Sequence, residues 1–114
     1  MVDSVDFDGF EWDLGKSDLS YVKHGIDFEA AIRIFDDVYV QRESKVDHGE
    51  PRYLAIGLID GIYVAVVWTP RARNRRIITA RRARDSERKL YDELRAKIEA
   101  QESERDTTEE PGTD

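Results

Sequence analysis

Two histidines are the first residues in this 114-residue sequence whose type suits chemistry. His24 follows Lys23 and precedes Gly25, and His48 follows Asp47 in a polar stretch. Histidine suits proton transfer because it is the side chain whose ordinary pKa lies near neutrality. Spacing alone favours a plainer interpretation of both, in which His24 is a surface residue near a helix end and His48 belongs to a polar loop.

Arginine supplies the second group of candidates. The whole chain carries a net charge of −7, but residues 71–89 contain nine basic and two acidic residues. A guanidinium binds two phosphate oxygens at once and stays protonated at neutral pH, so it stabilises phosphate charge but cannot act as a base. Arg81 lies near the end of a predicted strand, and Arg52 enters an apolar strand where it needs an acid or a phosphate as partner. Charge alone leaves two alternatives open: a polyanion-binding surface, and a block neutralised by the protein's own acids, with Glu87 or the acidic N-terminus as a partner for Arg81.

The last predicted helix provides a further candidate. Glu87 and Tyr91 are four residues apart and therefore share a helix face. A tyrosine there is more commonly part of the core, and the alternative is a hydroxyl that approaches a phosphate. The sequence lacks cysteine, a phosphate-binding glycine loop and the H-E-x-x-H and G-x-S-x-G motifs. These absences exclude a thiol nucleophile and argue against a nucleotide hydrolase, a metalloprotease and a serine hydrolase, and we expect no cofactor.

Capping residues and apolar spacing predict the helices that position these side chains. Asp13 can cap a helix over about residues 15–24, and Gly25 follows where a left-handed residue commonly ends a helix. Asp27 precedes a second helix, in which apolar residues recur at i, i+3, i+4 and i+7. A third helix of about four turns is expected from about residue 84 to Ala100.

Five strands are predicted, a short one at 10–13 and four more at 38–40, 53–59, 62–69 and 75–82. Asp60-Gly61 predicts a two-residue hairpin between the third and fourth of them. Alternation along the last strand places Arg81 on the face of Ile77 and Arg82 on the face of Ile78.

Consecutive strands joined by hairpins indicate an α+β domain: an antiparallel β-sheet meander with two N-terminal helices and one C-terminal helix. We expect a single domain over residues 10–100, between a disordered acidic N-terminus at 1–9 and a disordered acidic tail at 101–114. No apolar run has the length of a membrane helix, and the N-terminus lacks the pattern of a signal peptide, so we expect a cytoplasmic protein.

Several short motifs occur in a characteristic order over residues 10–94. The first are Phe10-Glu11-Trp12-Asp13, Lys23-His24-Gly25 and Phe35-Asp36-Asp37. The later ones are Arg52-Tyr53-x-x-Ile56-Gly57, the run from Arg76 to Ala83, Glu87-Arg88 and Tyr91. Taken together, this ordered set resembles the BrnT toxin family.

The resemblance implies a RelE-like fold and a toxin of a type II toxin–antitoxin system, a ribonuclease that cuts RNA without a metal ion and inhibits translation. It also implies a BrnA-like ribbon-helix-helix antitoxin as partner, with operator DNA bound only through the complex. The catalytic residues expected on this basis are His24, His48, Arg52 and Arg81, with Lys23 and Tyr91 in support. The arginines expected to hold the RNA backbone by charge are Arg71, Arg73, Arg75, Arg76, Arg82 and Arg84.

Two alternatives from other functional classes stay open at the level of sequence. A non-catalytic nucleic-acid-binding module would explain the arginines equally well, and so would a protein-interaction module whose basic face docks an acidic partner. An inactive toxin homologue would behave like one of these two modules and would not cut RNA.

Overall fold

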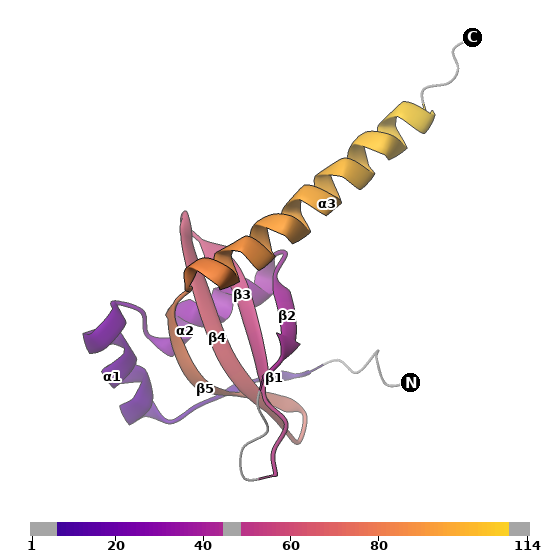
Figure 1. Ribbon diagram of the computed structural model, residues 1–114. Coiled ribbons are helices and arrows are strands. Elements are labelled where there is room, and N and C mark those ends of the chain that lie inside the picture. Colours follow the sequence, from indigo (N-terminus) through magenta and orange to yellow (C-terminus); the bar gives the residue numbers. More distant parts are fainter. Residues whose placement is uncertain (1–6, 45–48, 110–114) are drawn as a thin grey trace.

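The computed structural model describes residues 7–44 and 49–109, which form a five-stranded sheet with helices packed against both of its faces (Figure 1). In chain order the elements are β1 (Gly9–Glu11), α1 (Leu14–His24), α2 (Phe28–Ala31), η2 (Ile32–Asp36), β2 (Val40–Glu43), β3 (Tyr53–Ile59), β4 (Ile62–Arg71), β5 (Asn74–Arg82) and α3 (Asp85–Glu109). The predicted α+β class is confirmed.

Both predicted ends of the first helix and the predicted start of the second are also confirmed. The Asp13 carboxylate accepts a hydrogen bond from the Lys16 backbone N–H at 3.0 Å, and Gly25 adopts a φ of 74° after the last turn of α1. Asp27 caps α2 in the same way as Asp13 caps α1. The second predicted helix is only partly α-helical, because the chain tightens into the 3₁₀ helix η2 after Ala31.

The sheet has the strand order β1-β5-β4-β3-β2, and one of its pairings differs from the prediction. Strands β2 to β5 form the expected antiparallel meander, whereas β1 pairs in parallel with β5. The sheet is therefore mixed. The parallel pair joins residues more than 60 positions apart in the sequence, so no local hairpin signal could predict it.

The hairpin between β3 and β4 forms where it was predicted. Asp60 and Gly61 have φ values of 51° and 83°, the positive values that a two-residue hairpin of this type requires. Next to it, Gly57 lets η2 approach the sheet closely, since a Cβ at this position would lie 2.6 Å from Cβ of Ile34.

The core has two parts, one on each face of the sheet. The larger part packs α2 and η2 against one face and includes Phe28, Ile34, Val66, Trp68 and Ile77. The smaller part packs the first turns of α3 against the other face, where Leu54, Ile56, Ala65 and Tyr91 meet. The second part covers only one end of that face, because α3 leaves the sheet soon afterwards (Figure 1).

The C-terminal helix is longer than predicted. We expected it to end near Ala100, but α3 continues to Glu109 and projects beyond the sheet (Figure 1). Residues 101–109 lack an apolar stripe but include Gln, Glu and Arg, which have high helix propensity. Near the other end of the chain, Phe7 and Asp8 also make contacts, with Trp68 and Arg73 respectively. Within the described chain, no helix combines the length and the apolar character needed to cross a membrane.

Candidate active site

Helix α1 covers the edge of β5 that β1 leaves open. Among the described residues, β1 pairs only with Asn74–Arg76, so the later part of β5 has no strand on that side. The Ser20 hydroxyl lies 2.6 Å from the carbonyl oxygen of Ile26 and 3.0 Å from that of Ala80. The Phe28 N–H donates a hydrogen bond to the Ser17 hydroxyl at 2.9 Å. Two serine hydroxyls, rather than large apolar side chains, therefore attach α1 to β5 and to α2.

A pocket of about 270 Å³ lies between α1 and this edge of β5. Its lining includes Lys16, Lys23 and His24 from α1 and Thr79 from β5. Two amines, an imidazole and a hydroxyl thus meet at one opening, so the pocket can bind an anion and exchange a proton with it. The other lining residues are Leu19, Ser20, Phe28, Ile78 and Ala80.

A β-bulge determines which way the following arginines point. Val67 pairs with Thr79 and Trp68 with Ile77, so Ile78 has no partner on β4. Ile77 and Ala80 consequently belong to the same core cluster, although simple alternation would place them on opposite faces. The prediction that Arg81 shares the face of Ile77 was therefore wrong. Arg81 pairs with Ala65 and faces α3.

Arg81 is held by a carboxylate on α3. Its two terminal nitrogens, Nη1 and Nη2, donate to the two oxygens of Glu87 at 2.8 and 2.9 Å. Glu87 is only 3% exposed and also accepts a hydrogen bond from the Arg84 N–H at 2.8 Å. The hydrogen bonds from Arg81 lower the pKa of Glu87 against the opposing effect of burial, and the same bonds raise the pKa of Arg81. Glu87 is therefore the acidic partner of Arg81 that the sequence analysis considered as an alternative to a phosphate.

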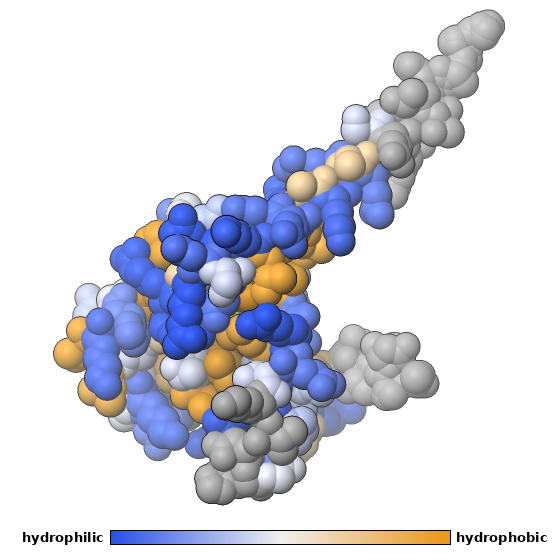
Figure 2. Space-filling model, viewed as in Figure 1, coloured by the Kyte–Doolittle hydropathy of each residue, from blue (hydrophilic) through white to orange (hydrophobic). Residues whose placement is uncertain are grey.

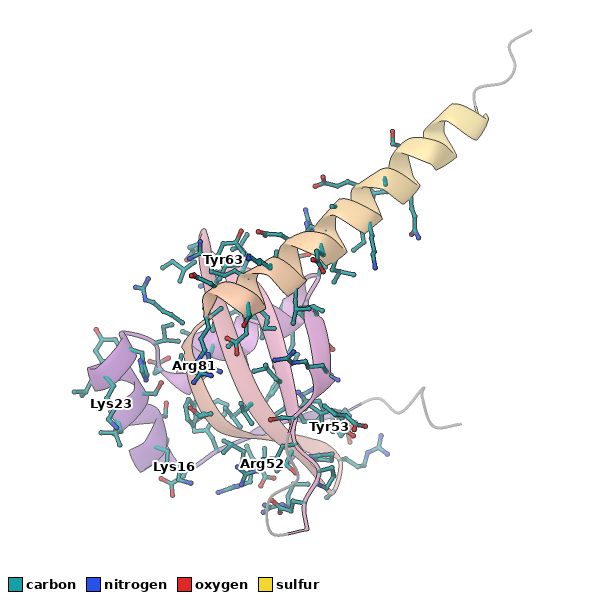
Figure 3. All side chains as sticks on the ribbon, in the orientation of Figure 1. Lys16, Lys23, Arg52, Tyr53, Tyr63 and Arg81 are labelled. Atoms are coloured by element: carbon teal, nitrogen blue, oxygen red, sulfur yellow. The ribbon has the colours of Figure 1, made fainter. Side chains whose placement is uncertain are left out.

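Arg81 does not line the pocket, but it follows the β5 residues that do. Thr79, which lines it, is two residues away on the same face of β5, about 7 Å along the strand. Three hydrogen bonds to described residues use three of the five N–H groups of Arg81, two to Glu87 and one to the Arg82 carbonyl. Figure 3 shows Arg81 between α1, which carries Lys16 and Lys23, and the start of α3. The guanidinium thus points to Glu87 and keeps N–H groups for a ligand.

Arg52 lies well away from Arg81. It precedes β3 and, by alternation with Leu54 and Ile56, faces the same side of the sheet as Arg81. Arg81 is in register with Ala65 and Ile56, so Arg52 is two strands and four residues away from it, about 16 Å between Cα atoms. The two arginines thus approach the same face of the sheet from different strands (Figure 3).

Three of the other arginines are neutralised within the protein. Arg71 pairs with Glu50, Arg73 with Asp8, and Arg76 with Glu11. Hydrogen bonds from Arg73 lower the pKa of Asp8, and those from Asn74 and Arg76 lower the pKa of Glu11. The predicted neutralisation by the protein's own acids is confirmed for this part of the block. Among the described residues, no carboxylate forms an ion pair with Arg82 or Arg84.

Arg75 has a different environment on the opposite face of the sheet. Its guanidinium carbon lies 4.5 to 5.8 Å from the ring centres of Phe7, Phe10, Phe35 and Trp68. It also donates to the Tyr39 hydroxyl at 3.3 Å. Arg75 thus joins β1, η2 and the sheet, and it is separated from the pocket that contains His24.

Tyr91, expected to support catalysis, does not line the pocket. Tyr91 is 5% exposed and packs edge-on against Tyr63 at 5.8 Å, so its ring belongs to the core. His48 falls within residues 45–48, outside the described residues. The pocket instead contains Lys16 and Thr79, which sequence reasoning missed. The available signal was the i, i+4, i+7 spacing of Lys16, Ser20 and Lys23, which places them on one helix face.

Comparison with known proteins finds one matching family and a similar crystal structure. Residues 12–87 match the family described as "Ribonuclease toxin, BrnT, of type II toxin-antitoxin system". The fold is similar to the crystal structure of the Brucella abortus ribonuclease toxin BrnT, with 29% sequence identity and a TM-score of 0.56. That similarity covers 68% of this chain and 97% of the Brucella chain. Among proteins with curated descriptions, none matches.

The family match covers two thirds of the chain and includes α1, β5 and Glu87, the parts that form the pocket and hold Arg81. The described residues contain no group of three or more His, Cys, Asp or Glu side chains that could hold a metal ion. The chain belongs to the BrnT family of ribonuclease toxins from type II toxin–antitoxin systems.

Proposed function

We propose that this chain is a metal-independent endoribonuclease that cuts RNA at the pocket between α1 and β5. The observation that carries the proposal is the basic lining of the pocket, where Lys16, Lys23 and His24 meet beside the anchored guanidinium of Arg81. The ribonuclease toxin family to which the chain belongs supports RNA as the substrate.

RNA supplies its own nucleophile, so the protein has to move two protons and stabilise charge. Neutral His24 accepts the proton of a 2′-hydroxyl while the 2′-oxygen attacks the adjacent phosphorus. The bond from phosphorus to the 5′-oxygen breaks, and the Lys23 ammonium protonates that oxygen. Arg81 stabilises the additional negative charge on the pentacovalent phosphorus. The products are a 2′,3′-cyclic phosphate and a 5′-hydroxyl.

The surrounding basic residues hold the RNA strand. Lys16 binds a phosphate at the pocket, and Arg52 binds a separate phosphate at the far end of the same sheet face. Arg82 and Arg84, which have no acidic partner among the described residues, add positive charge near the start of α3. His48 stays a candidate for the second proton carrier.

The cellular role follows from the same assignment. Cutting RNA inhibits translation in the cytoplasm, and a BrnA-like ribbon-helix-helix antitoxin neutralises the toxin and carries the complex to operator DNA. The four-stranded antiparallel part of the sheet, with helices packed against it, supports a RelE-like architecture.

The experiment that tests the proposal is cleavage of a 5′-labelled RNA by purified protein in EDTA. Wild-type protein should produce fragments that end in 2′,3′-cyclic phosphate, and His24→Ala should cut about 10²- to 10⁴-fold more slowly. Lys97→Ala is the matched control, because Lys97 is an exposed basic residue on α3, away from the pocket. Binding of RNA without cleavage would instead favour a nucleic-acid-binding module, and cleavage that depends on added Mg²⁺ would refute metal independence.

A further inference from the structure

Helix α1 exposes apolar side chains and buries polar ones, which is unusual for a helix that packs only against its own sheet. Six large apolar side chains are exposed in the described part of the chain, and four of them are on α1: Leu14, Leu19, Tyr21 and Val22. Leu14 and Val22 are 74% and 79% exposed, whereas the residues of α1 that are buried are Ser17 and Ser20. The usual pattern of an amphipathic surface helix is therefore inverted.

Leu19 and Val22 form an exposed apolar ridge with a basic edge and an acidic edge, and Leu14 and Tyr21 lie beyond the acidic edge. At 100° per residue, Val22 points away from the buried serines. Lys16 and Lys23 lie on one side of it and line the active-site pocket. Asp18 lies on the other side, where it lines a second hollow of about 360 Å³ together with Tyr21, Val22 and Asp27. Figure 2 shows orange apolar side chains at the outer edge of the molecule, over α1.

We propose that this face of α1 is the docking surface for the antitoxin, which contributes an amphipathic helix with acidic residues along one edge and basic residues along the other. The apolar stripe of that helix covers Leu19 and Val22, and one end of the helix contacts Leu14 at the start of α1. Its acidic edge pairs with Lys16 and Lys23, and its basic edge pairs with Asp18 and Asp27. The proposal rests on the proposed function, in which these lysines belong to the RNA-cutting site.

Size and charge favour a segment of a larger partner over a second copy of this chain. A helix of 11 residues is about 16 Å long and 10 Å wide. That strip is far smaller than the roughly 800 Å² per partner of a stable interface, so an occupant must extend onto neighbouring surfaces. Two copies paired antiparallel about a two-fold axis would also bring their lysine edges together, and only a parallel pair would place the lysines of one copy opposite Asp18 of the other.

Docking on this face has a direct consequence for activity. A carboxylate held between Lys16 and Lys23 occupies the position that a substrate phosphate needs, so RNA and antitoxin compete. The antitoxin thereby neutralises the toxin by covering the pocket.

The test measures binding of a purified full-length BrnA-like antitoxin to the full chain by calorimetry. The variant is Leu14→Asp with Val22→Lys, which places an acid at the N-terminal end of α1 and a base at its C-terminal end. Both charges suit the helix dipole and the net charge is unchanged, so the fold should be preserved. We expect antitoxin affinity to fall at least 30-fold while RNA cleavage stays within twofold of wild type.

The control is Leu58→Asp, which changes an exposed apolar side chain on β3 and should alter affinity by less than threefold. If the double variant binds the antitoxin as tightly as wild type, the docking surface is wrong.

If wild-type protein is a dimer by light scattering and the double variant is a monomer, a second copy is the occupant and the proposal is overturned. If wild type binds the antitoxin but cuts no RNA, the proposed function fails while loss of binding in the variant still supports the surface. A milder variant, Leu14→Ser with Val22→Ser, decides the question if urea unfolding shows that the charged one is not folded.

Discussion

Replacing Glu87 with glutamine tests how firmly Arg81 is held beside the pocket. Glu87 is buried and accepts three hydrogen bonds, two from the guanidinium of Arg81 and one from the Arg84 backbone. Glutamine keeps the shape and one acceptor oxygen, but its NH₂ group would face Nη2 of Arg81. The variant therefore loses one charge-assisted hydrogen bond and leaves the charge of Arg81 without its partner.

Removing one partner of a buried ion pair costs about 3–5 kcal/mol. The side chain of Arg81 is 21% exposed, so water compensates part of the loss. We therefore expect Glu87→Gln to lower the free energy of unfolding by about 2–3 kcal/mol at pH 7. For a chain of this size that corresponds to a decrease in Tm of roughly 8–12 °C.

The effect of Glu87→Gln on the free energy of unfolding should depend on pH, and the pKa of Glu87 gives the direction of that dependence. In the folded protein the pKa of Glu87 lies below its ordinary value of 4.5. The ionised carboxylate therefore stabilises the fold above about pH 4.5, and this stabilisation is lost as the pH falls through the folded-state pKa. The difference in unfolding free energy between wild type and Glu87→Gln should be full at pH 7 and should shrink below pH 4.5.

Urea unfolding of both proteins at pH 7 and at pH 3.5 measures this difference directly, and the other acids of the chain cancel in the comparison. A difference below 0.5 kcal/mol at pH 7, or one that is unchanged at pH 3.5, would refute the assignment of Glu87 as the buried partner of Arg81. The result also affects the simplest site variant. Arg81→Ala would leave Glu87 buried without its partner, so a loss of cleavage in this variant would not by itself assign Arg81 to catalysis.

Two further predictions concern the opposite face of the sheet. Gly57→Ala should lower the free energy of unfolding by about 1–3 kcal/mol in urea, because the new Cβ would lie 2.6 Å from Cβ of Ile34; an unchanged midpoint would show that η2 can move away. Arg75→Gln should lower the thermal midpoint through loss of about 1–2 kcal/mol of contact with the surrounding aromatic rings, yet leave RNA affinity within twofold at fixed salt; a marked drop in affinity would place Arg75 at the RNA surface after all.

Local signals in the sequence predicted most of the elements. Asp13, Asp27 and the pair Asp60-Gly61 act through contacts a few residues away, so their effect on the backbone is visible without a structure. The parallel pairing of β1 with β5 depends on residues at opposite ends of the chain. The length of α3 was underestimated because helix propensity alone maintains it after the apolar stripe ends.

The site was predictable only in part. Lys23 and His24 line the pocket as candidates identified from motif resemblance, and the ion pair of Arg81 with Glu87 was one of two alternatives. The bulge at Ile78 reversed the expected faces of the following residues, and nothing in the local sequence indicates it. The apolar spacing of α1 does not indicate Lys16, because this helix attaches to β5 and α2 through serines.

The measurement that tests the central claim most directly is growth arrest on induced expression, with total RNA examined in parallel. Wild type is compared with the double variant Lys23→Ala/His24→Ala, in which both substitutions are at exposed positions of α1 and leave the pair of Arg81 with Glu87 intact. We predict arrest and RNA degradation with wild type and neither with the variant, at equal amounts of folded protein. Arrest and RNA degradation by both proteins would contradict the assignment of the pocket as the active site.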